Sequence, residues 1–179
     1  MHKELRLSGS GGQGLILAGI ILAEAALDDG KNVVQSQSYG PEARGGASKS
    51  EVIISEDEIN YPKIGDSDIL LCLTEVAYDK YIGSLKENGV LILDNNITKK
   101  VDKDKCKVYK VPILDIAENK LKKPMVANIV ALGTIYELTN VVSKDSLEKA
   151  VLNRVPKGTE ELNKKALEYG FNLILDIKD

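Results

Sequence analysis

The stretch Leu5–Leu27, LRLSGSGGQGLILAGIILAEAAL, decides the fold. Leu5–Ser8 predicts a short strand. Leu15–Leu27 is rich in leucine, isoleucine and alanine, with Glu24 as its one charged residue, and this composition favours a helix packed against a sheet. Between them, Gly9–Gly14 fits the pattern G-x-G-x-x-G, which joins a strand to a helix in α/β proteins. The chain therefore begins with a strand, a tight glycine turn and a buried helix.

The same alternation continues along the chain. Gly30 suits the end of the first helix, and Asn88-Gly89 is a turn signal. Further strands are predicted at Val33–Gln37, Ser48–Ser55, Asp68–Leu73, Val90–Leu93 and Lys107–Val111. Further helices are predicted from the cap Thr74 to about Ile82, at Ile129–Leu138 capped by Asn128, at Leu147–Leu152 capped by Ser143, and from the cap Thr159 to Tyr169, ended by Gly170. This order predicts a three-layer α/β/α, Rossmann-like fold, with a mostly parallel sheet and a helical C-terminal third, as a single domain over residues 1–179.

Composition narrows the function. The chain has 179 residues, 43% of them hydrophobic and 28% charged, and a net charge of −3, which is ordinary for one globular domain. Its lysines and arginines are scattered, whereas a nucleic-acid protein needs a basic stripe. The apolar run Leu15–Leu27 is too short to span a bilayer, and no secretory signal precedes it. We expect a cytoplasmic protein with no nucleic-acid or membrane partner.

Catalytic residue types are scarce. The chain has two cysteines, Cys72 and Cys106, which are far apart in the sequence and belong to no CxxC motif. They supply too few ligands for a zinc or iron–sulfur site. The only histidine is His2, which leaves no credible base for a serine or cysteine nucleophile. We therefore expect no catalytic residue and no metal site in this chain, which is typical of part of an enzyme.

The glycine loop allows three interpretations. A dinucleotide site requires an acidic residue about 20 positions further on, at the end of the second strand. Val33–Gln37 contains none, and Asp28 and Asp29 come too early. The loop can instead contact a phosphate-bearing ligand at the helix start, alone or together with a partner chain, or it can simply allow tight strand–helix packing. Gln13 is the polar side chain in the loop that is long enough to donate to a ligand.

A second motif, Tyr39–Gly46 (YGPEARGG), follows the second predicted strand. If the first two strands are parallel neighbours, both loops lie on the carboxyl edge of the sheet, where α/β folds bind ligands. Arg44 can hold a phosphate or carboxylate, or it can pair weakly with Glu42. Tyr39 can stack on a planar group or be an ordinary half-buried tyrosine. Gly45-Gly46 supplies backbone freedom.

Together the two motifs resemble the gamma subunit, or gamma domain, of the pyruvate/2-oxoacid:ferredoxin oxidoreductases. That family has a G-x-G-G-Q-G loop followed by Y-G-x-E-x-R-G-G. The matching residues here are Gly9, Gly11, Gly12, Gln13, Gly14, Tyr39, Gly40, Glu42, Arg44, Gly45 and Gly46. The likeness extends through Asp68–Thr74, Asn128–Gly133 and Asn163–Gly170, which is nearly the whole chain. The short length is most similar to a separate gamma subunit of a 2-oxoglutarate-type enzyme.

The resemblance implies a function and partners. The assembled enzyme converts a 2-oxoacid, coenzyme A and oxidised ferredoxin to acyl-CoA, carbon dioxide and reduced ferredoxin. Thiamine diphosphate is implied on the alpha and beta subunits and iron–sulfur clusters on other chains, including a ferredoxin-like delta subunit. The gamma subunit is implied to support assembly and coenzyme A handling. We expect cofactor contacts from Gly9, Gly11, Gly12, Gln13, Gly14, Tyr39, Glu42, Arg44, Gly45 and Gly46, and no cofactor bound by this chain alone.

Three other assignments stay open at this point. The beta subunit of indolepyruvate:ferredoxin oxidoreductase shares the glycine loop. A free-standing nucleotide-binding or dehydrogenase domain would use the same loop, although the acidic position after the second strand is missing. A purely structural domain would use both loops only for docking.

Overall fold

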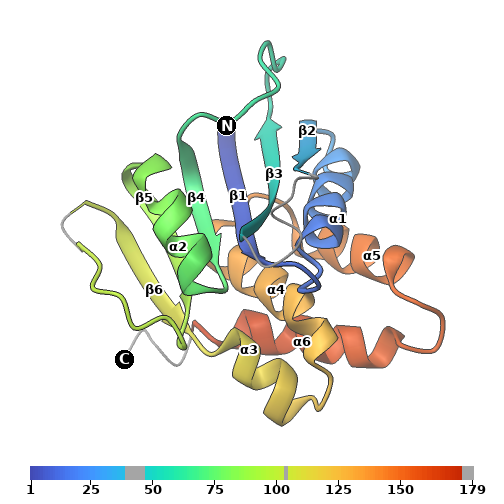
Figure 1. Cartoon of the computed structure of the whole chain (residues 1–179). Coiled ribbons are helices and arrows are strands. Elements are labelled where there is room, and N and C mark those ends of the chain that lie inside the picture. Colours follow the sequence, from blue (N-terminus) through green and yellow to red (C-terminus); the bar gives the residue numbers. More distant parts are fainter. Residues whose placement is uncertain (39–46, 103–104, 175–179) are drawn as a thin grey trace.

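We describe a computed structural model of the chain at residues 1–38, 47–102 and 105–174 (Figure 1). Its sheet has six strands in the order β2-β3-β1-β4-β5-β6. The strands are β1 (His2–Ser10), β2 (Asn32–Gln37), β3 (Ala47–Ser55), β4 (Ser67–Cys72), β5 (Leu85–Asp94) and β6 (Lys107–Val111). The pairs β1–β4, β4–β5 and β5–β6 are parallel, and β3 is antiparallel to both β1 and β2. Only β3 therefore opposes the other strands, which confirms a mostly parallel sheet.

One topological expectation is wrong. β1 and β2 run in the same direction but are not neighbours, because β3 lies between them and pairs with both. The chain between β2 and β3 is too short for the helical crossover that a parallel connection needs, so β3 returns antiparallel beside β2. The carboxyl ends of β1 and β2 nevertheless share one edge of the sheet, with the start of β3 between them.

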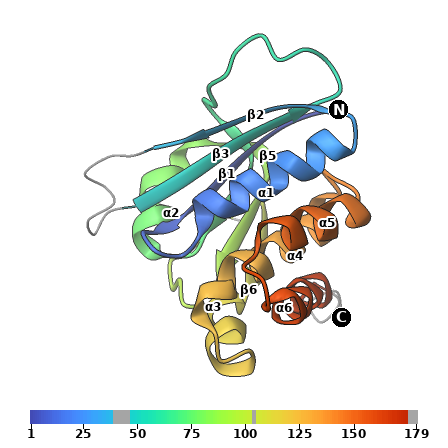
Figure 2. The ribbon, with the colours of Figure 1, turned by 90° about the vertical axis from the view of Figure 1, so that its right-hand side faces the viewer.

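Helices cover both faces of the sheet. The α-helices are α1 (Leu15–Asp28), α2 (Glu75–Tyr81), α3 (Ile113–Asp115), α4 (Ala127–Thr139), α5 (Lys144–Arg154) and α6 (Glu160–Asn172), and three short helical turns are η2 (Ile82–Ser84), η3 (Ile116–Lys120) and η4 (Pro124–Val126). In Figure 2, α2 lies on one side of the sheet, and α1, α4, α5 and α6 lie on the other. The predicted three layers and helical C-terminal third are confirmed.

Alternation along the strands builds two separate cores. Leu5, Leu7 and Leu71 point to the α1/α4 side and belong to the larger apolar cluster. Leu70 and Cys72 point to the α2 side and belong to the smaller one. This two-residue period is the one a sheet buried on both faces requires.

Some predicted helix ends are correct and others are not. The Oγ1 of Thr74 accepts a hydrogen bond from the Ala77 N–H at 3.3 Å, and the Oγ of Ser143 accepts one from Ser146 at 3.2 Å, so both caps are confirmed. Thr159 precedes α6, but its hydroxyl makes no bond to a backbone N–H of that helix.

Two further predicted helix ends are wrong. Asn128 does not cap α4, because the 3₁₀ turn η4 leads directly into that helix at Ala127 and places Asn128 inside it. Gly170 does not end α6, because it lies inside that helix where α4 packs against it. Among the described residues, no helix combines the length and the apolar character needed to cross a membrane.

Candidate functional site

The glycine loop connects β1 to α1 at the carboxyl edge of the sheet. Gly9 is still part of β1 and pairs with Ser48 of β3. Gly12 and Gly14 have positive φ angles of 86° and 73°, a left-handed conformation that glycine adopts without steric cost. The loop therefore needs glycine at these two positions for the backbone turn itself.

A side chain at Gly9 would displace Gln13, because Gln13 folds back over it. A Cβ on Gly9 would lie 2.2 Å from the Oε1 of Gln13 and 3.2 Å from the Cβ of Leu73. The Oε1 of Gln13 accepts a hydrogen bond from the Ser10 N–H at 2.8 Å. The side-chain carbonyl of Gln13 therefore stabilises the loop itself. The sequence predicted only that the Gln13 side chain could donate to a ligand.

Gly14 joins the loop to α4. The Nδ2 of Asn128 donates to the Gly14 carbonyl at 3.2 Å, and a Cβ on Gly14 would lie 2.6 Å from that nitrogen. Asn128 is 3% exposed, and its Oδ1 is the buried side-chain atom without a hydrogen-bond partner among the described residues. The amide is oriented by the Gly14 carbonyl, because a flipped amide would place two acceptors together. Sequence reasoning assigned Asn128 to a cap and missed this contact.

A cavity of about 590 Å³ opens at the start of α1. Its lining combines loop glycines with apolar residues of the first turns of α1 and with three serines: Ser10, Gly11, Gly12, Gly14, Leu15, Ile16, Leu17, Ile20, Ser38 and Ser48. No side chain among the described residues caps the N-terminus of α1, and no acidic residue lies in its first turn. Free N–H groups at a helix start attract anions and hydrogen-bond acceptors.

The described residues on either side of the second predicted motif lie at this cavity. Tyr39, Glu42, Arg44, Gly45 and Gly46 lie outside the described residues, so their predicted contacts stay predictions. Ser38, which precedes the motif, and Ser48, which follows it, both line the cavity beside the glycine loop. Ser38 and Ser48 therefore lie on the same edge of the sheet as the glycine loop, even though β1 and β2 are not neighbours.

Two exposed apolar side chains flank this edge. Val76 in the first turn of α2 is 57% exposed, and Met125 just before α4 is 73% exposed.

Asp94, at the end of β5, is 1% exposed and accepts backbone hydrogen bonds from Leu114 at 2.8 Å and Asn96 at 3.0 Å. Burial raises the pKa of the Asp94 carboxyl, and the backbone donors work against that rise. Asp94 thus fastens the chain after β5 and β6 instead of facing a ligand.

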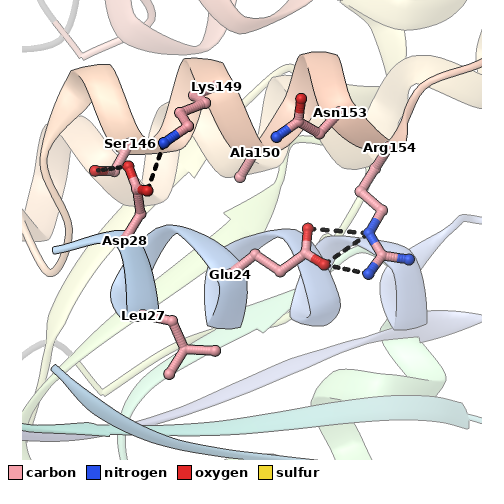
Figure 3. A pocket seen from close by; sticks show the side chains of 8 residues that line it. All are labelled: Glu24, Leu27, Asp28, Ser146, Lys149, Ala150, Asn153 and Arg154. Atoms are coloured by element: carbon pink, nitrogen blue, oxygen red, sulfur yellow. Dashed lines mark hydrogen bonds and ion pairs between the residues drawn. The ribbon is translucent and has the colours of Figure 1, made fainter. Parts of the chain in front are cut away.

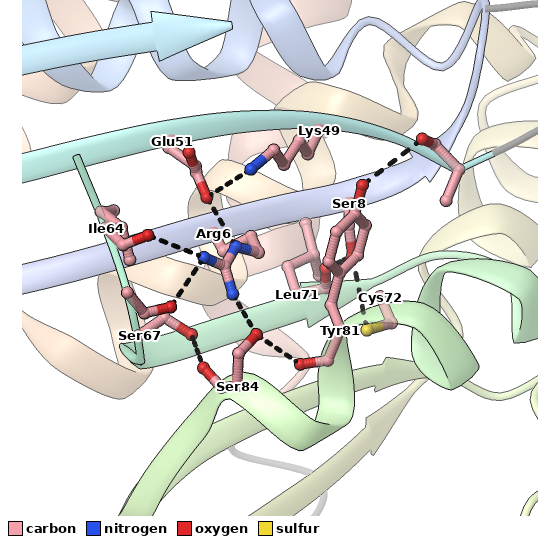
Figure 4. A network of polar contacts seen from close by, with 12 residues as sticks. Arg6, Ser8, Lys49, Glu51, Ile64, Ser67, Leu71, Cys72, Tyr81 and Ser84 are labelled. Atoms are coloured by element: carbon pink, nitrogen blue, oxygen red, sulfur yellow. Dashed lines mark hydrogen bonds and ion pairs between the residues drawn. The ribbon is translucent and has the colours of Figure 1, made fainter. Parts of the chain in front are cut away.

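On the α2 face, a buried ion pair ties loop 56–66 to the sheet (Figure 4). The Nε of Arg6 donates to Glu51 at 2.7 Å, and its guanidinium also donates to the Gly65 carbonyl at 3.0 Å and to Ser84. Lys49 reaches the same Glu51 carboxylate at 2.9 Å. Every charge in this network has partners, as a buried ion pair requires, so we assign it to structure.

A second cavity, of about 600 Å³, lies between α1 and α5 (Figure 3). Arg154 donates through Nε to both carboxylate oxygens of Glu24, at 2.8 and 2.9 Å, and Lys149 pairs with Asp28 at 2.6 Å. These ion pairs bridge the two helices and leave the charges already compensated. The cavity lies between two helices and is lined by paired charges, whereas the cavity at the glycine loop is lined by glycines, serines and apolar side chains.

Potential metal ligands do not cluster among the described residues. No group of three or more histidine, cysteine, aspartate or glutamate side chains within residues 1–38, 47–102 and 105–174 is placed to hold a metal ion. Cys72 is fully buried, and burial raises the pKa of its thiol to about 12, so the thiol is protonated at neutral pH.

Comparison with known proteins shows which family has this sequence and fold. The sequence profile of the pyruvate ferredoxin/flavodoxin oxidoreductase family matches residues 4–173. The 2-oxoglutarate synthase subunit KorC of Methanocaldococcus jannaschii is 54% identical, over 99% of this chain and 96% of that one. The crystal structure of a keto/oxoacid ferredoxin oxidoreductase gamma subunit from Geobacter sulfurreducens matches with a TM-score of 0.87 and 54% identity, over 97% of this chain and 99% of that one.

A larger enzyme contains the same fold. The 2-oxoglutarate:ferredoxin oxidoreductase of Magnetococcus marinus, solved with 2-oxoglutarate, coenzyme A and succinyl-CoA bound, superposes with a TM-score of 0.86 over 98% of this chain and 31% of that one. At 22% identity this likeness concerns the fold alone. From the profile match and the relatives at 54% identity, this chain belongs to the pyruvate ferredoxin/flavodoxin oxidoreductase family.

Proposed function

We propose that this chain is the gamma-type subunit of a 2-oxoglutarate:ferredoxin oxidoreductase, and that it supports assembly and coenzyme A handling rather than bond-making. The observation that carries the proposal is the cavity at the glycine loop. It places the N–H groups at the start of α1, which no described side chain caps, beside apolar Ile16 and Ile20. That pairing suits a long ligand with phosphates at one end and an alkyl-amide arm, which is the chemistry of coenzyme A.

The bond-making groups belong to other chains in this proposal. At the described carboxyl edge, the buried carboxylate of Asp94 is already bonded to backbone N–H groups, and Cys72 is a protonated buried thiol. Neither is free to act as a base or nucleophile. Thiamine diphosphate would be held by alpha- and beta-type chains and the iron–sulfur clusters by a ferredoxin-like delta chain, with ferredoxin as the electron acceptor and the cytoplasm as the location.

The glycine loop can be tested with a matched pair of substitutions. Gly12 and Gly158 have φ angles of 86° and 88°, and a Cβ on either would meet open space. Alanine therefore imposes the same left-handed backbone strain, about 1–2 kcal/mol, at both positions. Only Gly12 lines the cavity; Gly158 lies between α5 and α6.

We expect Gly12→Ala to raise the KM for coenzyme A of the assembled enzyme severalfold and Gly158→Ala to leave that KM at the wild-type value. Both substitutions should lower the melting temperature of the subunit by the same amount. Equal KM values in the two variants would contradict a role for the loop in coenzyme A handling. The predicted contact of Arg44 is tested in the same assay by Arg44→Ala.

Assembly is tested by purification of the tagged chain from its own organism. We expect large thiamine-binding chains and a small ferredoxin-like chain to accompany it. A fused thiamine-binding partner that turns over indolepyruvate would instead support the indolepyruvate enzyme, which the comparisons do not favour. Tight NAD(H) binding by the isolated chain would contradict the proposal and support a free-standing nucleotide-binding domain.

A further inference from the structure

The segment Lys120–Met125, which we name the lysine turn, concentrates positive charge on an acidic protein. The whole chain carries a net charge of −3. Lys120, Lys122 and Lys123 are all exposed, and none of them makes an ion pair within the part of the chain that the structure describes. Three neighbouring ammonium groups repel one another unless opposite charge is brought to them.

The turn is held in one shape. The Leu121 N–H donates to the Ile116 carbonyl at 2.9 Å, and the Lys123 N–H donates to the Ala117 carbonyl at 2.8 Å. The side chain of Leu121 is buried. The lysines are therefore presented from a turn with fixed backbone hydrogen bonds and a buried anchor.

Lys122 occupies a position that geometry gives to glycine. Its φ angle is 57°, and a residue that closes a helix in this left-handed conformation is usually glycine, or sometimes asparagine. A lysine here costs stability relative to glycine. The chain therefore keeps a charged side chain where backbone strain and like-charge repulsion both oppose it, which points to a role outside the fold.

Met125 adds an apolar contact point to the same surface. It is 73% exposed, although the next two residues, Val126 and Ala127, are buried. Three residues further on, Asn128 holds the Gly14 carbonyl of the glycine loop. Figures 1 and 2 show α3 and the following segment projecting from the sheet and the C-terminal helices. The turn is thus both prominent and directly connected to the candidate site.

We propose that the lysine turn is a docking surface for an acidic protein surface of another chain of the same assembly, with Met125 packing into an apolar spot among that chain's carboxylates. The inference rests on the proposed function, because it takes the partner from that complex. A polynucleotide is disfavoured, since it needs a broad basic stripe rather than one turn. Charge complementarity of this kind fixes the orientation of docking and speeds association.

The test compares two triple charge reversals in the co-expressed complex. The first is Lys120→Glu, Lys122→Glu and Lys123→Glu. The control is Lys63→Glu, Lys157→Glu and Lys165→Glu, which changes net charge equally at three exposed lysines that also make no ion pair among the described residues. We measure the recovery of thiamine-binding chains with the tagged subunit across a salt series, and coenzyme A dependence in whatever assembles.

We expect the turn variant to lose recovery about tenfold, the control to match the wild type, and wild-type recovery to fall as salt rises. Recovery of the turn variant equal to the control would overturn the proposal. So would normal recovery with weakened coenzyme A dependence, which would assign the lysines to a small anion. If the wild-type chain itself recovers no thiamine-binding partner, the proposed function fails instead.

A single substitution separates docking from folding. Lys122→Gly removes one charge and relieves the left-handed strain. We expect the melting temperature of the subunit to rise by about 2–4 °C while partner recovery falls at moderate salt. A variant that is stabilised and binds its partners as well as the wild type would contradict the assignment of Lys122 to docking.

Discussion

Gly133 of α4 and Gly170 of α6 touch backbone to backbone. A Cβ on Gly133 would lie 2.4 Å from the Leu167 carbonyl oxygen and 2.9 Å from the Cα of Gly170, and a Cβ on Gly170 would lie 2.3 Å from the Val130 carbonyl oxygen. Both clashes are with backbone, which cannot rotate away. This crossing brings the last helix against α4, and α4 in turn holds the glycine loop through Asn128.

We expect Gly133→Ala to lower the free energy of unfolding by about 1–3 kcal/mol, because the two helices must separate to admit the methyl group and overpacking outweighs the gain in helix propensity. Urea unfolding followed by circular dichroism measures the change. Gly83→Ala is the control, since a Cβ there meets nothing within 4 Å and its φ is not positive. Equal midpoints for the two variants would show that the crossing is looser than described.

The sequence predicted the units of the fold better than their arrangement. The strand–glycine–helix start and the caps Thr74 and Ser143 depend on local chemistry, and all three are confirmed. The position of β3 between β1 and β2 depends on which strand pairs with which, and that is set by contacts between residues distant in the chain. Gly170 was mistaken for a helix end because glycine serves equally at helix ends and at close helix crossings.

In the candidate site, too, the sequence predicted the local features but not the contacts between distant residues. The glycine pattern located the loop, and the positive φ angles of Gly12 and Gly14 explain two of its glycines. Asn128 and Met125 lie more than a hundred residues further along the chain, and no local pattern connects them to the loop. Their roles depend on the packing of α4 against the start of α1, which only the tertiary structure reveals.

Gly14 and Asn128 should be energetically coupled. Gly14→Ala places a methyl group 2.6 Å from the Nδ2 of Asn128 and also strains a φ of 73°. Asn128→Ala removes the clash, the 3.2 Å hydrogen bond and the Oδ1 that has no partner among the described residues. We expect the double variant to be about 1–2 kcal/mol more stable than the sum of the single effects predicts. A double-mutant cycle by urea unfolding measures this, and strict additivity would mean that the two residues do not restrain each other.

The two cysteines should differ sharply in reactivity. Cys72 is fully buried, and burial raises the pKa of its thiol to about 12, whereas Cys106 is only half-buried and its pKa is raised less. Because the thiolate is the reactive form, we expect an aromatic disulfide reagent at pH 8 to label one thiol in the folded chain and two in denaturant. Cys106→Ser should abolish the native labelling. Rapid labelling of Cys72 in that variant would show that the α2 face opens readily.

Acid should weaken the contact between α1 and α5 through Asp29. Burial alone would raise the pKa of the Asp29 carboxyl, but hydrogen bonds from Ser143 and Ser146 outweigh it and hold the pKa below its ordinary value of 3.8. The Ser143 N–H and hydroxyl each donate to this carboxylate at 2.6 Å. A carboxyl group whose pKa is lower in the folded state than in the unfolded state stabilises the fold above its unfolded pKa. That contribution is lost as the pH falls below about 4 and through the folded pKa.

We therefore expect the urea midpoint of the wild type to exceed that of Asp29→Asn at pH 7, and the gap to narrow between pH 4 and pH 2 as the wild-type carboxyl is protonated. Asp28→Asn is the companion variant. Hydrogen bonds from Lys149 and Ser146 also lower the pKa of Asp28, but Asp28 is more exposed than Asp29, so solvent screening should make its gap smaller. A gap for Asp29→Asn that stays constant from pH 7 to pH 2 would mean that the charge of Asp29 does not stabilise the start of α5.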